Sequence, residues 1–248
     1  HKSTSVNQKS KSGRTPLFDA AMQGNTVIVE ILLGQEGILV NDADNLKHTP
    51  LYAAAALGHK DIVKTLLAKK SIAVNQATQK EKTPLLAAVK IKNRDIVKML
   101  LAHESIDVNQ AEQRGASPLF AAVQSGHADK AIVNMLLAKK KIDVNQATRK
   151  GKTPLDAALS NPDKDIIKKL LLRTKKNHPS IKKAQNIIKR LDKKSQSNQS
   201  STDKEKIANE KNRSERKKKE AVEKKRNDAD KKRALAKERL SPKTSATY

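Results

Sequence analysis

The chain has 248 residues and a formal net charge of +26, from 52 Lys and Arg against 26 Asp and Glu. It has no Cys, which excludes disulfide bonds and Cys-ligated metal sites, and no apolar run approaches the roughly 20 residues that cross a bilayer. Because it has no Trp, two Phe and two Tyr, its core must consist of Leu, Ile, Val and Ala, which suits thin helical layers.

One tripeptide recurs along the chain. Successive copies begin 34, 34, 34 and 36 residues apart, as Thr15-Pro16-Leu17, Thr49-Pro50-Leu51, Thr83-Pro84-Leu85, Ser117-Pro118-Leu119 and Thr153-Pro154-Leu155. A Val-Asn pair lies nine positions before each copy, beginning at Val6, Val40, Val74, Val108 and Val144. Two landmarks that keep a fixed phase over five copies indicate a repeat protein.

Each unit predicts two short helices and a loop. The hydroxyl of Thr or Ser caps a helix, and Pro suits its first turn, where no hydrogen bond is lost. A turn such as Gly24-Asn25, Gly58-His59 or Gly126-His127 follows, and then a second helix with apolar pairs four residues apart, such as Ile62-Val63 and Leu66-Leu67. One helix pair cannot bury both faces, so we expect the pairs to stack around a continuous core.

Residues 49–75 and 117–145 show the pattern most fully: Thr/Ser-Pro-Leu, Ala-Ala, Gly-His, Ile-Val-x-x-Leu-Leu and Val-Asn. This pattern resembles the ankyrin repeat, over roughly residues 5–172. The resemblance implies an all-α solenoid of about five helix–loop–helix repeats with hairpin-like connecting loops, in which repeats start near residues 15, 49, 83, 117 and 153. It specifies the fold and leaves the partner open.

The chain departs from that family at one position. The His that usually follows Thr-Pro-Leu is replaced by Phe18, Tyr52, Leu86, Phe120 and Asp156. Two interpretations are open: these side chains pack between neighbouring repeats, or they form a row that faces a ligand. Asp156 is the polar member expected of an end repeat.

The resemblance implies that a partner lies on the concave side, against loop tips and the ends of the first helices. The loop tips are mostly basic, which predicts an acidic partner; the alternative is that these charges only keep the chain soluble. The candidate partner-binding residues are Leu46, His48, Leu57, Gln79, Lys80, Lys82, Lys90, Ile91, Gln113, Arg114, Gln124, Arg149, Lys150 and Lys152.

The two ends of the chain differ from the repeats. Val6-Asn7 and Gly13 indicate that residues 1–14 are the end of a preceding, truncated repeat. At the other end, Pro179 and a stripe of apolar residues from Ile181 to Leu191 predict a capping helix within residues 173–194. A free amphipathic helix for a membrane surface is the alternative.

Residues 195–248 are predicted to be a basic tail, disordered or a single fraying helix. Residues 173–248 contain 26 Lys and Arg against 10 Asp and Glu. Clusters at residues 217–219, 224–226 and 231–233 resemble nuclear-localisation or nucleic-acid-binding segments, without interleaved aromatics for base stacking. Charged C-terminal tails also resemble those of bacterial ankyrin effectors that are delivered into host cells.

No catalytic residue, cofactor or metal site is predicted. The six His residues show no metal-ligand spacing, and the chain has no phosphate-binding Gly-rich loop. We therefore expect a non-enzymatic, monomeric protein-binding scaffold inside a cell, most simply in the cytoplasm. Its alternatives are a nuclear or nucleic-acid-associated adaptor that uses the tail, and an effector that binds a host protein.

Overall fold

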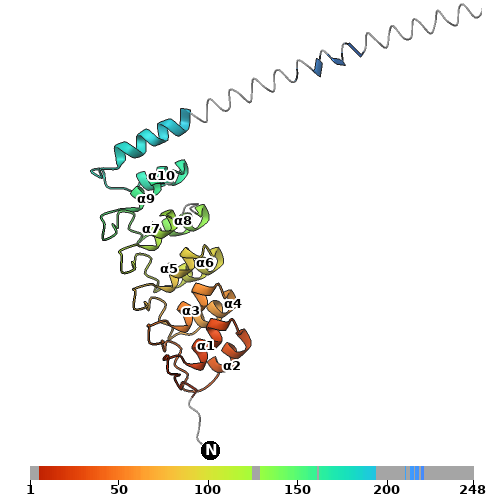
Figure 1. Ribbon diagram of the computed structural model, residues 1–248, viewed down its shortest axis with the longest axis vertical. Helices are drawn as coiled ribbons and strands as arrows, with labels where there is room; N and C mark the ends of the chain where they lie inside the picture. Colours follow the sequence, from red (N-terminus) through yellow and green to blue (C-terminus); the bar gives the residue numbers. More distant parts are fainter. Residues whose placement is uncertain are drawn as a thin grey trace, which may run out of the picture. The chain divides into compact units, whose positions relative to one another are not determined.

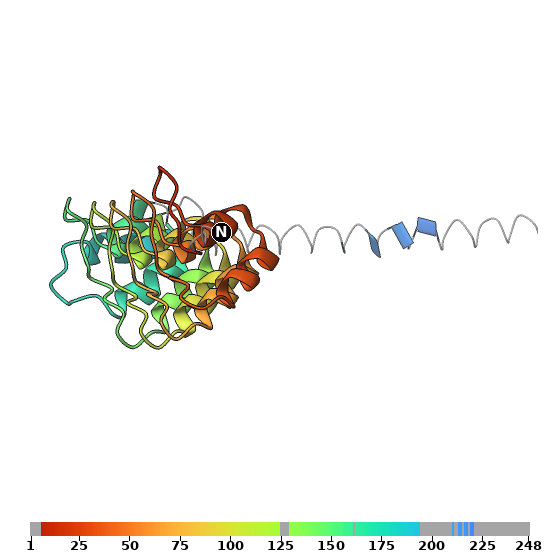
Figure 2. The ribbon, with the colours of Figure 1, turned by 90° about the horizontal axis from the view of Figure 1, so that it is seen from below.

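The computed structural model describes residues 6–124, 129–160 and 162–193, together with a few positions between 210 and 220. The chain separates into two compact units, His1–Lys189 and Arg190–Tyr248. In the first unit, helix pairs stack in chain order, and the connecting loops form a column on one side (Figure 1). The end-on view shows that these loops project beyond the helices (Figure 2).

Each repeat contributes two short helices, and the first helix of every pair lies on the loop side (Figure 1). The pairs are α1 (Pro16–Gln23) with α2 (Thr26–Leu33), α3 (Pro50–Leu57) with α4 (Lys60–Leu67), α5 (Pro84–Lys90) with α6 (Arg94–Ala102), α7 (Pro118–Gln124) with α8 (Lys130–Leu137), and α9 (Pro154–Ser160) with α10 (Lys164–Leu171). A further helix covers residues 181–193. The predicted all-α solenoid of repeated helix pairs is confirmed.

The start of each first helix follows the predicted capping chemistry. Thr15, Thr49 and Thr83 have extended backbone, and each hydroxyl accepts a hydrogen bond from the N–H three residues later. Helices α1 and α3 end at Gly24 and Gly58, which adopt the left-handed conformation with φ of 77° and 83°. The predicted turn at Gly126-His127 lies outside the described residues.

The core follows the predicted apolar stripe, in which Leu67 and Leu171 are only partly buried, and the first repeat departs from it most. The Ile at the third position of α4, α6, α8 and α10 is at most 3% exposed. Its equivalent in α2, Ile28, is 44% exposed, and Leu32 is only partly buried. Ile28 is therefore exposed where its equivalents are buried, because no described helix packs on that side of α2.

The Asn of each Val-Asn pair joins its repeat to the next one. Asn41 Nδ2 donates to the carbonyl of Ser71 at 2.7 Å, and its Oδ1 accepts from Ala73 N at 2.8 Å. Asn7, Asn75 and Asn109 make the same pair of bonds one repeat earlier or later. The recurrence of this residue is explained by a cross-link between backbones, while the Val before it lies in the core in the four later copies, Val40, Val74, Val108 and Val144.

The position that replaces the family His is largely a packing position. Phe18, Leu86 and Phe120 are at most 4% exposed, and Tyr52 is partly buried. These values support packing between repeats over a ligand-facing aromatic row.

Asp156, at the same position in the last repeat, contacts the segment that follows α10. Its carboxylate accepts a hydrogen bond from the Ser180 hydroxyl and two from Thr153, at 2.8 Å each. The helix then begins at residue 181, two residues after Pro179, and Ala184 is fully buried. Before this helix, His178 and Ser180 turn inward to Thr153 and Asp156.

Candidate protein-binding surface

The loops that connect the repeats are hairpins joined in a row. Each is closed by a backbone bond across its tip, such as Thr78 N to Lys82 O at 3.0 Å. Neighbouring tips are joined by Asn45 N to Ser12 O, Gln79 N to Leu46 O, Gln113 N to Lys80 O and Arg149 N to Arg114 O, at 2.9–3.1 Å. The five tips therefore form one continuous strip, on which side chains recur at fixed intervals.

One tip position requires a left-handed backbone in every loop. Gly13, Gly115 and Gly151 occupy it with φ between 71° and 80°, whereas Lys47 and Glu81 occupy it with φ near 60°. A side chain at Gly115 would meet Arg149 N at 2.7 Å, so the absence of Cβ also allows the next loop to approach. Lys47 and Glu81 carry the strain of a non-glycine residue in this region.

The predicted tip residues lie together on this strip. All of them are exposed except Lys82 and His48, which are partly buried. Six cations at the tips of the last three loops form no ion pair with any described residue: Lys80, Lys82, Arg114, Arg149, Lys150 and Lys152. Their charges are therefore available to a partner, across the last three loops.

Two apolar side chains are exposed at the ends of the first helices. Leu57 ends α3 and is 55% exposed, and Ile91 follows α5 and is 45% exposed. A Cβ added at Gly58 would lie 3.8 Å from Ile91 Cδ1, so Ile91 reaches back to the end of α3. Leu57 and Ile91 thus form a small apolar patch over the second and third repeats.

Lys90 differs from the other predicted cations because it has a partner. Its Nζ lies 2.7 Å from Glu112 Oε2, and Glu112 is largely buried. Burial, and then the negative charge of Glu112, raise the pKa of Tyr52 above its usual value. This group fixes side chains between neighbouring repeats, so Lys90 offers less free charge than the tips.

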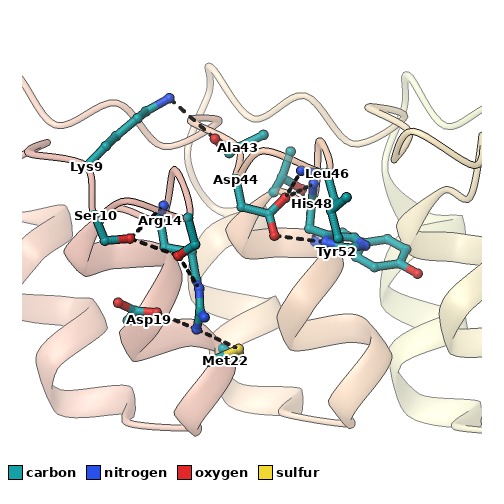
Figure 3. A network of polar contacts seen from close by, with 12 residues as sticks. Lys9, Ser10, Arg14, Asp19, Met22, Ala43, Asp44, Leu46, His48 and Tyr52 are labelled. Carbon is teal, nitrogen blue, oxygen red and sulfur yellow. Dashed lines mark hydrogen bonds and ion pairs between the residues drawn. The ribbon is translucent and has the colours of Figure 1, made fainter.

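His48 is also held by the fold (Figure 3). Its ring stacks on Tyr52 with centroids 5.1 Å apart, and its Nδ1 lies 2.9 Å from Asp44 Oδ2. Burial raises the pKa of Asp44, but hydrogen bonds from His48 and Leu46 outweigh it and keep that pKa below its usual value. The charged Asp44 therefore braces the tip that presents Leu46, which is 52% exposed.

The first loop has its own network of polar contacts. Arg14 donates to Ser12 and Asp19, and Lys9 donates to the carbonyl of Ala43 (Figure 3). Lys9 and Arg14 of this loop are thus engaged within the repeats. Free positive charge on the strip is concentrated toward the later loops.

Other kinds of site are not found where the structure can be described. Over residues 6–193, apart from the short gaps at 125–128 and 161, no group of His, Asp and Glu could hold a metal ion. No helix of the described chain is long and apolar enough to cross a membrane. Shallow hollows occur beside the connectors of the later repeats, one of about 530 Å³ near His103 and Lys140.

One surface was missed by the prediction of site residues. Val27, Ile28 and Ile31 of α2 are 65%, 44% and 59% exposed. Ile28 occupies the position that is buried in the later repeats. The signal that could have revealed this surface is Val27, which is aligned with Asp61 and Asp95 in the next two repeats.

Helix pairs stacked on one core, with loops joined tip to tip, define an α-solenoid repeat protein that presents an extended surface. The chain belongs to the ankyrin-repeat family, since the family model for ankyrin repeats (3 copies) matches residues 2–78 and 85–183. Arrays of this family are protein–protein interaction modules and are generally non-enzymatic. No curated protein matches the chain.

Proposed function

We propose that this chain is a protein-binding scaffold whose partner presents an acidic surface to the loop tips and first-helix ends. The observation that carries the proposal is the set of six unpaired cations at the tips of the third, fourth and fifth loops. Complementary charge accelerates encounter and disfavours wrong partners. The rigid strip reduces the ordering cost of binding, because the loops are already joined to one another.

The apolar patch of Leu57 and Ile91 supplies the water-excluded core of the proposed interface. Binding energy concentrates in a few buried side chains, and charged residues form the rim around them. In this arrangement an apolar side chain of the partner packs on the patch while its carboxylates face Lys80 and Lys82. Leu46 extends the apolar contact at the neighbouring tip.

The test is capture of a partner by the tagged full chain, followed by measurement of affinity with the captured protein. The quadruple variant K80E/K82E/R149E/K150E should lose at least tenfold in affinity, chiefly because association slows. The matched control K64E/K98E/K140E/K168E reverses four exposed cations on the second helices and their connectors. If both variants bind as the wild type does, the tips are not the binding surface.

The tail carries the second candidate function. Its clusters are Lys-rich, so any nucleic-acid contact is to phosphates and weakens with salt. Those clusters lie largely outside the described residues. A chain truncated before residue 195 should keep partner capture if the repeats bind. Loss of capture, or of binding to duplex DNA at low salt, would favour the adaptor proposal.

The remaining proposals concern the cellular location and the oligomeric state of the protein. A monomer inside the cytoplasm is the simplest arrangement for this scaffold. Nuclear targeting and delivery into a host cell rest on the composition of residues 195–248 alone. Expression of the chain with and without the tail, fused to a fluorescent reporter, distinguishes tail-directed targeting from passive distribution.

A further inference from the structure

Helix α2 presents an apolar face that no other second helix has. Val27, Ile28 and Ile31 are spaced one and three residues apart, so they lie together on one side of the helix. They are 65%, 44% and 59% exposed. Glu30 lies within the same exposed face, one turn from Val27.

The later repeats show that this face departs from the pattern of the chain. Three of the other second helices have Asp where α2 has Val27, namely Asp61, Asp95 and Asp165. The same three helices have Lys where α2 has Glu30, namely Lys64, Lys98 and Lys168. Helix α2 therefore has an apolar residue where those helices have a carboxylate, and a carboxylate where they have a cation.

The charge around α2 also opposes the charge of the whole molecule. Residues 15–46 contain five carboxylates and no Lys or Arg, in a chain of net charge +26. Three of the five face a cation or His within the repeats, at Asp19, Asp42 and Asp44. Glu30 and Glu36 form no ion pair with any described residue.

A helix pair stacked as the other repeats stack would not cover this face completely. Such packing buries Ile62 and Ile96, the equivalents of Ile28, to 1% exposure or less. It leaves Asp61 and Asp95, the equivalents of Val27, exposed. A partner that contacts Val27 and the unpaired Glu30 must therefore approach the outer side of α2 and carry positive charge.

We propose that the face formed by Val27, Ile28, Glu30 and Ile31 is a second docking surface, whose partner is a basic amphipathic helix of another protein. The apolar stripe of that helix packs on Val27, Ile28 and Ile31, and its Lys or Arg residues reach Glu30 and Glu36. This is the helix-packing mode of peptide recognition, in which side chains at helical spacing supply the anchors. The acidic first repeat excludes an acidic helix by like-charge repulsion.

The probe is a fluorescein-labelled 18-residue peptide with Leu at helical spacing and Lys elsewhere, titrated with the full chain by anisotropy. The decisive variant is V27D/E30K/I31T, which gives α2 the residues that α4 has at 61, 64 and 65. Its affinity for the peptide should fall at least tenfold. All three positions are exposed, so its melting temperature should stay within about 2 °C of wild type.

Three controls separate this surface from general charge attraction. The variant E104K removes an exposed carboxylate from the third repeat and should bind as wild type does. A peptide with Leu at the same spacing and Glu in place of Lys should not bind, and a scrambled Leu/Lys peptide should bind at least tenfold more weakly. The tip variant K80E/K82E/R149E/K150E should keep its affinity for the Leu/Lys peptide, which makes this result independent of the proposed function.

Two outcomes would overturn the proposal. One is equal affinity of the wild type and V27D/E30K/I31T for the peptide. The other is a dimer in sedimentation velocity that V27D/E30K/I31T abolishes, since a second copy would then occupy the face.

Discussion

At the scale of single residues, the Asn of each Val-Asn pair joins neighbouring repeats through hydrogen bonds to backbone. Asn75 illustrates this, because its Nδ2 donates to Ser105 O at 2.6 Å and its Oδ1 accepts from Asp107 N at 2.9 Å. Both partners belong to the next repeat. One residue therefore sets the spacing of two connectors, which accounts for its place in every unit.

The substitution Asn75→Ala should lower the free energy of unfolding by about 1–3 kcal/mol, since it removes two hydrogen bonds of about 0.5–1.5 kcal/mol each. Urea denaturation followed by circular dichroism measures this loss. Gln79→Ala, at an exposed tip nearby, should change stability by no more than about 0.5 kcal/mol. Equal effects of the two substitutions would contradict the role assigned to Asn75.

Two substitutions at the left-handed tip position should change the stability of the fold in opposite directions. Lys47→Gly should stabilise the fold by about 0.5–1 kcal/mol, because φ is 60° at an exposed residue. Gly115→Ala should destabilise it by about 2 kcal/mol or more, since its Cβ would lie 2.7 Å from Arg149 N. Thermal melts of both variants check the signs, and a stabilising Gly115→Ala would show that the loops are free to separate.

At the scale of helices, burial depends on the neighbour rather than on the residue. Ile96 and Ile28 occupy the same position in α6 and α2, yet they are 0% and 44% exposed. Ile96→Ala should cost about 2–5 kcal/mol, the range of large-to-small changes in a packed core. Ile28→Ala should cost less than about 1 kcal/mol. Chemical denaturation of the two variants measures the difference, and equal costs would mean that Ile28 is covered in solution.

The carboxylate of Asp156 is one of the groups that hold the segment after α10. Burial raises the pKa of Asp156, but hydrogen bonds from Ser180 and Thr153 outweigh it, so the pKa lies below its usual value. A depressed carboxyl pKa stabilises the folded state above about pH 4, and this contribution is lost as pH falls through the folded-state pKa.

We therefore expect Asp156→Ala to loosen residues 178–189, which we propose as the cap of the fifth repeat. Protection of the Ala184 amide, which donates to Ser180 O at 2.9 Å, should fall roughly tenfold in hydrogen exchange at pH 6. Amides of α4 should keep their protection. In the wild type, protection of Ala184 should weaken below about pH 4, and Asp156→Ala should lack this dependence.

At the scale of the whole molecule, we expect repulsion among the excess cations to outweigh the surface ion pairs. Residues 1–172 contain 26 Lys and Arg against 16 Asp and Glu. The pairs that link second helices are exposed, as in Lys60–Asp95 at 2.9 Å and Arg94–Asp129 at 2.7 Å, and exposed pairs contribute little. The hydrogen bond and charge of Asp95 raise the pKa of Lys60, which stays protonated throughout the neutral range.

Added salt should therefore stabilise the protein. Raising NaCl from about 20 mM to about 300 mM shortens the screening length several-fold and weakens repulsion among the excess cations. We expect the melting temperature to rise by about 2–4 °C, which corresponds to about 1 kcal/mol for a chain of this size. A lower melting temperature at high salt would show that the inter-repeat ion pairs dominate instead.

The sequence alone determined the features that depend on neighbours along the chain. Thr-Pro-Leu predicts where first helices begin, because a hydroxyl cap and a Pro act within one turn. The fixed phase of Val-Asn reveals the repeat length and therefore the stacking. Most of the predicted tip residues are exposed on one strip, since their place in the repeat unit follows from that phase.

Only the tertiary structure decided the features that depend on contacts between repeats. The same Ile is buried in α6 and exposed in α2, because burial requires a helix on the other side. Asn75 links two repeats, Glu112 neutralises Lys90, and His48 holds a loop tip in place. None of these roles can be predicted from the local sequence pattern. The physical reason is that capping and turn preferences act over three or four residues. The contacts that shape the binding surface instead join residues about 20 to 35 positions apart, and they form only when the pairs stack.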